Sequence, residues 1–150
     1  MKVSEFCTHK FVFGDTADTL LDAAGRMSLQ NSDYLVVIEK QGDYLTAKGV
    51  ITNRDIINQT ILEDINPASM TLGDVIIRDP VIAREDDELE NVISRMTEMG
   101  LRYLPVVDNS GVLTGVITMD VLFNVLFEEI TRLRLMLRGT NETAHISKSI

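Results

Sequence analysis

The phrase GVITNRDII, residues 49–57, places a threonine and a carboxylate where side chains can bind a small polar or anionic ligand. Thr52 stands where a predicted strand ends and a predicted helix begins. Free amide groups at a helix start can bind an anion, and the threonine hydroxyl can add one hydrogen bond. Asp55 lies one turn farther along the same side, and Arg54 carries charge that can neutralise phosphate. Gly49 lets a backbone or a ligand approach closely.

The same residues also have a purely structural interpretation. Thr-Asn-Arg-Asp is a variant of the capping box, in which Thr52 caps the helix and Asp55 bonds back toward the helix start. The two roles can coexist. The pattern alone therefore leaves both a binding role and a capping role open for Asp55.

A second copy of the phrase begins at Gly115, 66 residues after the first, as GVITMDVLF. Upstream of the phrases the two halves of the chain match in a register of 69 residues. The matched pairs are Val12 and Val81, Asp18 and Asp87, Leu20 and Leu89, Met27 and Met96, and Tyr34 and Tyr103. The chain is therefore a tandem duplication. The register changes where residues 43–48 face the shorter segment 112–114, which predicts a longer hairpin in the first half.

The elements that must position these residues follow one order in both halves. Each half reads as strand, helix, strand, hairpin, strand, helix. The first strands are predicted at 10–13 and 80–83, the helices at 16–28 and 86–99, and the next strands at 34–39 and 103–108. The near-continuous apolar character of that last pair predicts strands buried on both faces. Gly100 fits the left-handed residue that ends a helix, and residues 65–71 break the chain between the halves.

Composition excludes several classes of function. A net charge of −9 disfavours nucleic-acid binding, although it permits one nucleotide in a local cationic pocket. No apolar run approaches the roughly 20 residues that span a bilayer, and the start of the chain does not resemble a secretory signal. We therefore expect a cytoplasmic protein without membrane insertion.

Catalytic and metal-binding motifs are also missing from the sequence. There is no H-E-x-x-H, C-x-x-C, nucleophile elbow or phosphate-binding P-loop, so the chain is not expected to be an enzyme or to hold a metal. The acidic run at 85–90 is interpreted as a solvated helix start rather than a metal site. The single cysteine, Cys7, is interpreted as a small buried hydrophobe.

The C-terminal segment has a different pattern. A helix with an apolar seam along one face is predicted over 121–138. Because one small repeat is too short to cover this face, the segment is predicted to hold a homodimer together. The seam consists of Leu122, Leu126, Ile130, Leu133 and Leu137, and Phe123, Phe127 and Met136 broaden it. Residues 139–150 are polar and are predicted to form a flexible tail.

Taken together, these pieces resemble a tandem pair of cystathionine β-synthase (CBS) domains, often called a Bateman module. The resemblance runs from about Val3 to Phe127 and rests on three pairs of segments in register. They are TADTLLDAAGRM with DDELENVISRM, YLVVIEKQG with YLPVVDNSG, and the two GVIT phrases. The resemblance implies an α/β (α+β) fold of two β-α-β-β-α repeats, at 1–69 and 70–127, packed about a pseudo-twofold axis and followed by a long C-terminal helix. In many relatives the clefts between the repeats bind AMP, ADP, ATP or S-adenosylmethionine, and no cofactor is required.

The family's G-h-h-[ST]-x-x-D pattern implies that Asp55 accepts hydrogen bonds from both vicinal hydroxyls of a ribose. In the second phrase the residue three after Thr118 is Val121, and Asp120 comes one residue early. Neighbours are separated by about 100° around a helix, so Asp120 does not replace the missing aspartate. The departure predicts one competent nucleotide site rather than two.

Other candidate ligand contacts flank the apolar strands. The family often carries a basic residue where Arg102 stands, reaching toward a ligand phosphate, while the matching residue of the first half is Asp33. The alternative for Arg102 is a surface arginine. His9 and Lys10 precede the first strand, where relatives place groups around the base, and the alternative for His9 is an exposed loop residue.

Two functions follow from the resemblance. The first is a free-standing regulatory module for energy or metabolite sensing, which binds an adenosine-containing nucleotide in an inter-repeat cleft and signals to an unidentified partner protein. The second is a ligand-independent homodimerisation and protein-interaction module with vestigial clefts. Thr52 and Asp55 favour the first, and Val121 favours the second.

Overall fold

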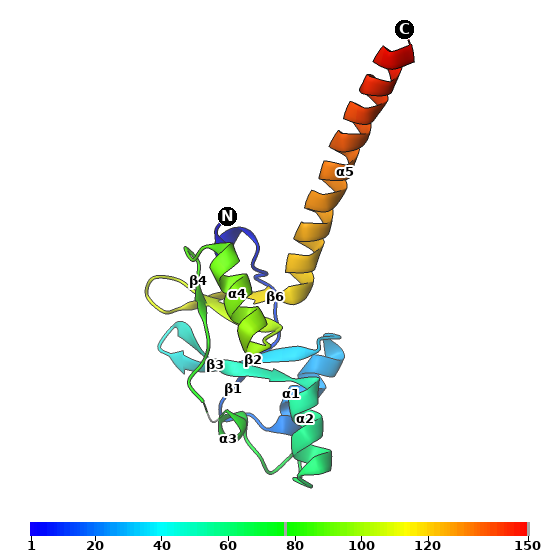
Figure 1. The fold of residues 1–150 in the computed structure, drawn as a ribbon. Helices are drawn as coiled ribbons and strands as arrows, with labels where there is room; N and C mark the ends of the chain where they lie inside the picture. Colours follow the sequence, from blue (N-terminus) through cyan, green and yellow to red (C-terminus); the bar gives the residue numbers. More distant parts are fainter. Residues whose placement is uncertain (77, 150) are drawn as a thin grey trace. The chain divides into compact units, whose positions relative to one another are not determined.

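The computed structural model describes the backbone of residues 1–76 and 78–149 and the side chains of this range as far as Gly139. The chain divides into two compact units, Met1–Thr118 and a second unit that begins at Met119. Two three-stranded sheets lie in the first unit (Figure 1). The second unit is the helix α5, Met119–Ser149.

Each sheet is built by one half of the duplication. The first contains β1 (Phe13–Asp15), β2 (Tyr34–Gln41) and β3 (Tyr44–Thr52), and the second contains β4 (Ala83–Arg84), β5 (Tyr103–Val107) and β6 (Leu113–Thr118). In both sheets the first strand pairs parallel with the second, and the second pairs antiparallel with the third. The predicted α+β architecture of two equivalent repeats is confirmed.

The main helices follow the predicted order. The helices are η1 (Val3–Glu5, 3-10), α1 (Leu20–Leu29), α2 (Asn53–Ile57) continuing as the π-helical η2 (Asn58–Leu62), α3 (Leu72–Val75) and α4 (Leu89–Met99). Two short helices that the sequence did not predict, η1 and α3, precede the first strand of each repeat. Gly100 ends α4 with a φ of 66°, the left-handed conformation that the sequence predicts.

Several predicted boundaries are shifted by about three residues. The first strand was expected at 10–13, but β1 begins at Phe13, because the ladder starts only where the Val36 amide reaches the Val12 carbonyl at 2.9 Å. The first helix was expected from residue 16 and begins at Leu20. Before it, the Asp18 amide donates to the Asp15 carbonyl at 3.0 Å, so residues 15–18 form a turn.

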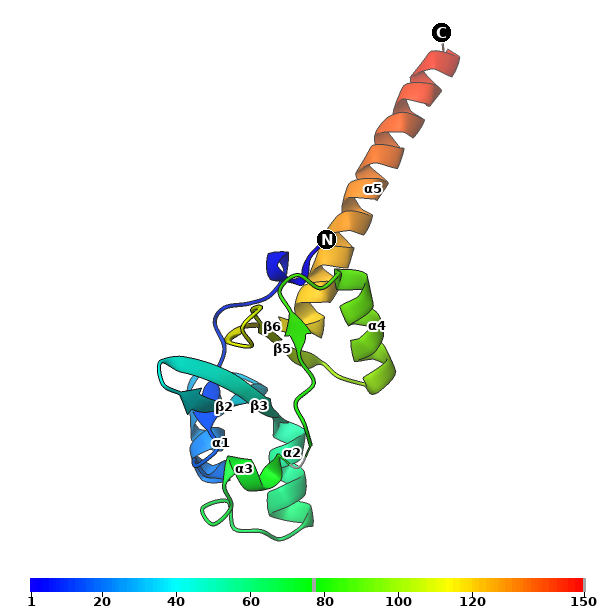
Figure 2. The same cartoon turned by 90° about the vertical axis from the view of Figure 1, so that its left-hand side faces the viewer.

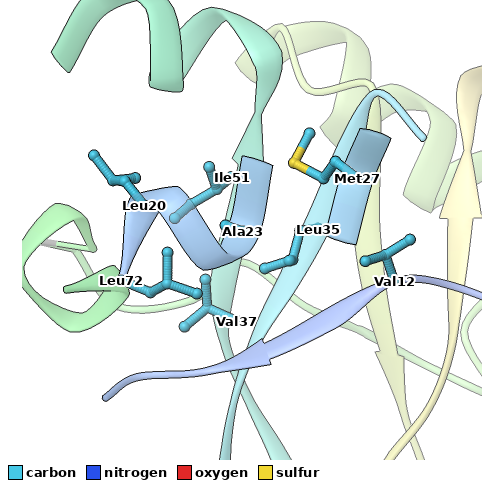
Figure 3. Close-up of a cluster of buried hydrophobic side chains, with 8 residues drawn as sticks. All are labelled: Val12, Leu20, Ala23, Met27, Leu35, Val37, Ile51 and Leu72. Carbon is cyan, nitrogen blue, oxygen red and sulfur yellow. The ribbon is translucent and has the colours of Figure 1, made fainter. Parts of the chain in front are cut away.

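Strand β2 is buried on both faces, as predicted. Leu35 and Val37 belong to the core of the first repeat, where α1 covers one face of the sheet (Figure 3). Val36 and Ile38 point the other way and pack with Leu113 and Val116 of the second sheet. Alternate residues of one strand therefore build two different apolar clusters, which joins the two repeats.

The repeats exchange their leading segments. The Val3 amide donates to the Asp87 carbonyl at 3.1 Å, and its register mate Leu72 donates to the Asp18 carbonyl at 2.8 Å. Both leading side chains have no exposed surface. Figure 2 shows α3 beside the helices of the first repeat, and η1 lies near β4 of the second. Each predicted repeat therefore buries its first residues against the other.

The first hairpin is longer than the second, as the change in register predicts, and β2 and β3 are joined through Gly42 at a φ of 63°. Each hairpin carries one bulge, between Val37 and Ile38 and between Val106 and Val107. In the ladder these bulges leave Lys48 and Thr114 without a partner residue. A bulge redirects its side chain relative to the pleat.

Helix α5 differs from its prediction at both the seam and the end. Leu122, expected in the apolar seam, is 3% exposed, whereas its neighbour Phe123 is 63% exposed. The helix continues to Ser149 instead of stopping at 138, and no proline interrupts it. Among the described residues, no helix combines the length and the hydropathy needed to cross a membrane.

Candidate functional site

A cleft in the first unit is formed by the end of β3, the start of α2, the segment 78–81 and the turn between α4 and β5. It consists of two adjoining hollows of about 330 and 670 Å³. The hollows share five lining residues, Val50, Asp55, Arg78, Leu101 and Tyr103. Both repeats therefore contribute walls to the same cleft.

Asp55 is held at the edge of this cleft by the capping box that the sequence predicts. Its Oδ2 accepts from the Thr52 amide at 2.8 Å and from the Thr52 hydroxyl at 3.1 Å, while the Asp55 amide donates to the Thr52 hydroxyl at 3.4 Å. Among the described residues, Oδ1 of Asp55 accepts no hydrogen bond. The capping interaction therefore uses one carboxylate oxygen and leaves the other available.

The same capping box occurs at two other helix starts, Thr19 with Asp22 and Thr71 with Asp74. Hydrogen bonds from Thr19 and Thr71 lower the pKa of Asp22 and of Asp74 below the ordinary value. Neither aspartate lines the cleft. The Thr-x-x-Asp pattern is therefore a general device of this chain for starting helices, and only its location in the cleft distinguishes Asp55.

Three arginines line the larger hollow, which sets its charge. Arg54 comes from α2, Arg78 from the segment between α3 and β4, and Arg102 from the turn before β5. Carboxylates of Asp33 and Asp55 also line it. Although the chain carries a net charge of −9, three cations are concentrated here beside the Asp55 carboxylate, which can accept hydrogen bonds from hydroxyl groups.

Arg78 and Asp79 are cleft residues that the sequence reasoning missed. They follow His9 and Lys10 by the repeat distance of 69, so applying the register to those two candidates would have found them. Lys48 is a further addition, brought to the smaller hollow at the β3 bulge, where its Nζ pairs with Glu39 at 3.0 Å.

The remaining walls of the cleft are apolar. The ring of Tyr103 stacks on its register mate Tyr34, with centroids 4.1 Å apart and planes inclined by 20°. The side chain of Ile76 packs against the backbone of Gly49, where an added Cβ would lie 2.7 Å from Ile76 Cδ1. Gly49 therefore accommodates a side chain of the protein itself.

The other candidate residues lie elsewhere. His9 Nδ1 is 2.8 Å from the Thr114 carbonyl oxygen. The backbone amide of Lys10 donates to the Thr8 hydroxyl, which in turn donates to the Lys10 carbonyl. Thr118 is the buried last residue of β6, and Asp120 belongs to the first turn of α5. His9, Lys10 and Thr118 do not line the cleft around Asp55.

Cys7 occupies the place in the second repeat that Ile76 occupies in the first. Its Sγ would lie 3.0 Å from a Cβ added at Gly115. The side chain is only partly buried, not fully buried as predicted, and this partial burial raises the pKa of its thiol. Among the described residues, no group of three or more His, Cys, Asp and Glu side chains is arranged to hold a metal ion.

Comparison with known proteins finds the same fold in other chains. The family model of the CBS domain matches residues 72–128. The crystal structure of CBSX2 in complex with AMP superposes with a TM-score of 0.71 at 22% identity, covering 85% of this chain and 96% of that one. Residues 72–128 therefore match the CBS domain family, and the chain has the fold of a tandem pair of CBS domains. The CBS domain pair of protein MJ0100, in complex with 5′-methylthioadenosine and S-adenosyl-L-methionine, superposes with a TM-score of 0.73 at 19% identity and covers 86% and 98%.

Curated relatives extend beyond this CBS pair. An uncharacterised protein of Methanopyrus kandleri is 25% identical over 125 residues, and the mitochondrial CBS domain-containing protein CBSX3 of Arabidopsis thaliana is 28% identical over 129 residues. Each match covers 83% of this chain and 62% of the relative. The chain thus spans less than two thirds of the length of either relative.

Proposed function

We propose that this CBS pair binds one adenosine-containing nucleotide per chain in the cleft at Asp55 and acts as a regulatory module that signals occupancy to a partner protein. The observation that carries the proposal is the state of the Asp55 carboxylate. Its Oδ2 is used by the helix cap, and its Oδ1 is available beside the arginines of the cleft.

The chemistry of the cleft matches the three parts of such a ligand. A carboxylate accepts hydrogen bonds from vicinal ribose hydroxyls, and charge-assisted bonds of this kind are among the stronger ones. The guanidinium groups of Arg54, Arg78 and Arg102 suit phosphate or another anionic group. Val50, Ile76 and Leu101 provide apolar surface for a base. The two hollows, of about 330 and 670 Å³, have the size of small-molecule sites, about 300–1,000 Å³.

Relatives with the same fold support this ligand class. CBSX2 was crystallised with AMP, and the CBS pair of MJ0100 with 5′-methylthioadenosine and S-adenosyl-L-methionine. All three molecules contain adenosine. The departure at Val121, where the second phrase lacks the aspartate, supports one site per chain rather than two.

Regulation follows from the construction of the cleft. Asp55 and Arg54 belong to the first repeat, and Arg78 and Arg102 belong to the second. A ligand that contacts both repeats has a different affinity for each relative arrangement of the repeats, and this difference is what shifts a conformational equilibrium. A partner protein that contacts both repeats would detect that shift.

Isothermal titration calorimetry against AMP, ADP, ATP and S-adenosylmethionine tests the proposal, using protein stripped of carried-over nucleotide. We expect one of the four to bind at micromolar affinity with about one site per chain. Two equivalent sites per chain would contradict the assignment to Asp55 alone. Absence of heat with all four would contradict nucleotide binding.

A ligand-independent interaction module is the second candidate. It is favoured by Ile76, whose side chain packs against Gly49 in the cleft. The calorimetric panel separates the two functions, because a module with vestigial clefts gives no saturable heat with any nucleotide.

A further inference from the structure

Helix α5 exposes a regular apolar stripe once Leu122 is removed from the predicted seam. Leu122 is buried, and the exposed seam begins one residue later. Its members are Phe123, Leu126, Ile130, Leu133 and Leu137, between 51% and 64% exposed. Their spacing is three, four, three and four residues, which is the a and d pattern of a heptad repeat. The seam predicted from the sequence, which starts at Leu122, has a spacing of four, four, three and four residues and does not follow the heptad repeat.

The residues flanking the stripe determine which partner it fits. With Phe123 at position a, Glu129 falls at position g and Arg134 at position e of the next heptad. In a parallel, in-register pair of helices, each g residue faces the e residue five positions later on the other helix, and such pairs set the choice of partner and orientation. Glu129 and Arg134 are five positions apart and opposite in charge.

An antiparallel pair would not use these charges. In that arrangement g positions face g positions and e positions face e positions. Glu129 would meet Glu129 or Met136, and Arg134 would meet Arg134 or Phe127. The pattern of charge therefore distinguishes the two orientations.

We propose that α5 pairs with α5 of a second copy of this chain as a parallel, in-register, two-stranded coiled coil, with Glu129 of each copy paired to Arg134 of the other. Ile130 at a and Leu133 at d suit a two-stranded pair, because β-branched residues at a and leucine at d favour dimers. Among the described residues, Glu129 forms an ion pair within its own helix, with Arg132 at 3.1 Å, and both side chains remain more than half exposed. The inference is independent of the proposed ligand.

Charge reversal with a matched control tests the pairing. Glu129→Arg places like charges opposite each other twice per dimer, whereas Glu128→Arg makes the same change one residue earlier, at position f, away from the partner. By sedimentation velocity we expect a wild-type dimer, a dissociation constant raised about tenfold by Glu129→Arg, and no change with Glu128→Arg. The double variant Glu129→Arg/Arg134→Glu should recover the wild-type constant. A wild-type monomer, or equal effects of the two single reversals, would overturn the proposal.

Disulfide trapping tests the orientation separately. In a Cys7→Ser background, Leu126→Cys places two thiols at the same d position of a parallel pair, within the Cα separation of about 4.4–6.8 Å that a disulfide requires. We expect Leu126→Cys to cross-link to itself on mild oxidation. In an antiparallel pair d positions face a positions, so cross-linking only in a mixture of Leu126→Cys with Leu137→Cys would show an antiparallel pair and would overturn the parallel assignment.

Discussion

Replacing Asp55 by alanine separates the two roles of this residue, because the chain carries the same capping box elsewhere. Asp22→Ala removes an equivalent cap at the start of α1, outside the cleft. Losing a helix cap costs about 1 kcal/mol of stability. We expect similar losses in the free energy of unfolding from Asp55→Ala and Asp22→Ala, since both carboxylates accept from a threonine amide at nearly the same distance, 2.8 and 2.9 Å.

Ligand affinity should respond differently. A charged hydrogen-bond partner contributes about 1–3 kcal/mol, so Asp55→Ala should weaken binding of AMP, or whichever of the four nucleotides binds most tightly, by roughly 5- to 150-fold. Asp22→Ala should leave the dissociation constant unchanged. Asp55→Asn keeps an oxygen that can accept from the Thr52 amide but removes the charge. It should therefore lose less stability than Asp55→Ala while still losing affinity.

Calorimetry gives the affinities, and urea unfolding of the ligand-free proteins gives the stabilities. The reasoning fails if Asp55→Ala binds the nucleotide as tightly as wild type, because the carboxylate would then serve only the helix cap. It fails equally if Asp22→Ala weakens binding as much as Asp55→Ala, because the effect would then arise from lost stability and not from contact with the ligand.

Two further predictions concern packing and pH. Gly115→Ala should destabilise the protein by about 1–3 kcal/mol in urea unfolding, because its Cβ would lie 2.8 Å from the Thr8 carbonyl oxygen. Gly49→Ala should cost less, since the nearest atoms to its Cβ belong to the Ile76 side chain and not to the backbone, and equal losses would contradict this contrast. Hydrogen bonds from Thr71 lower the pKa of Asp74, so its contribution to stability is present above the unfolded pKa of about 3.9 and is lost as pH falls through the lower folded value. Between pH 5 and pH 3, Asp74→Asn should therefore lose less stability than wild type in urea unfolding, and parallel pH profiles would refute this.

Much of the fold follows from the sequence because its signals are local and occur twice. The register of 69 residues identifies the duplication, the apolar run of β2 predicts burial on both faces, and Gly100 marks the end of α4. The predicted starts of β1 and α1 were wrong by about three residues. A strand begins where the backbone amide of a partner strand donates to its carbonyl group. That partner is distant in sequence, so the local pattern does not contain this information.

The candidate site divides in the same way. Thr52, Asp55, Arg54 and Arg102 were chosen from the sequence, and all four line one cleft. Their role in binding remains a proposal. Arg78 and Asp79 were missed because the register of 69 residues was not applied to His9 and Lys10, and they line the cleft because the segment between α3 and β4 crosses its wall.

The sequence by itself determined the duplication, the order of the main elements, the capping box at Thr52 and the helix end at Gly100, because each depends on residues a few positions apart or on direct comparison of the two halves. Only the tertiary structure decided which neighbours those elements meet. It buried Val3 against the second repeat and Leu72 against the first. It also buried Leu122 and exposed Phe123, two adjacent apolar residues that helical periodicity alone does not rank. The physical reason is that burial depends on contacts between distant segments, whereas periodicity records only which residues share a face.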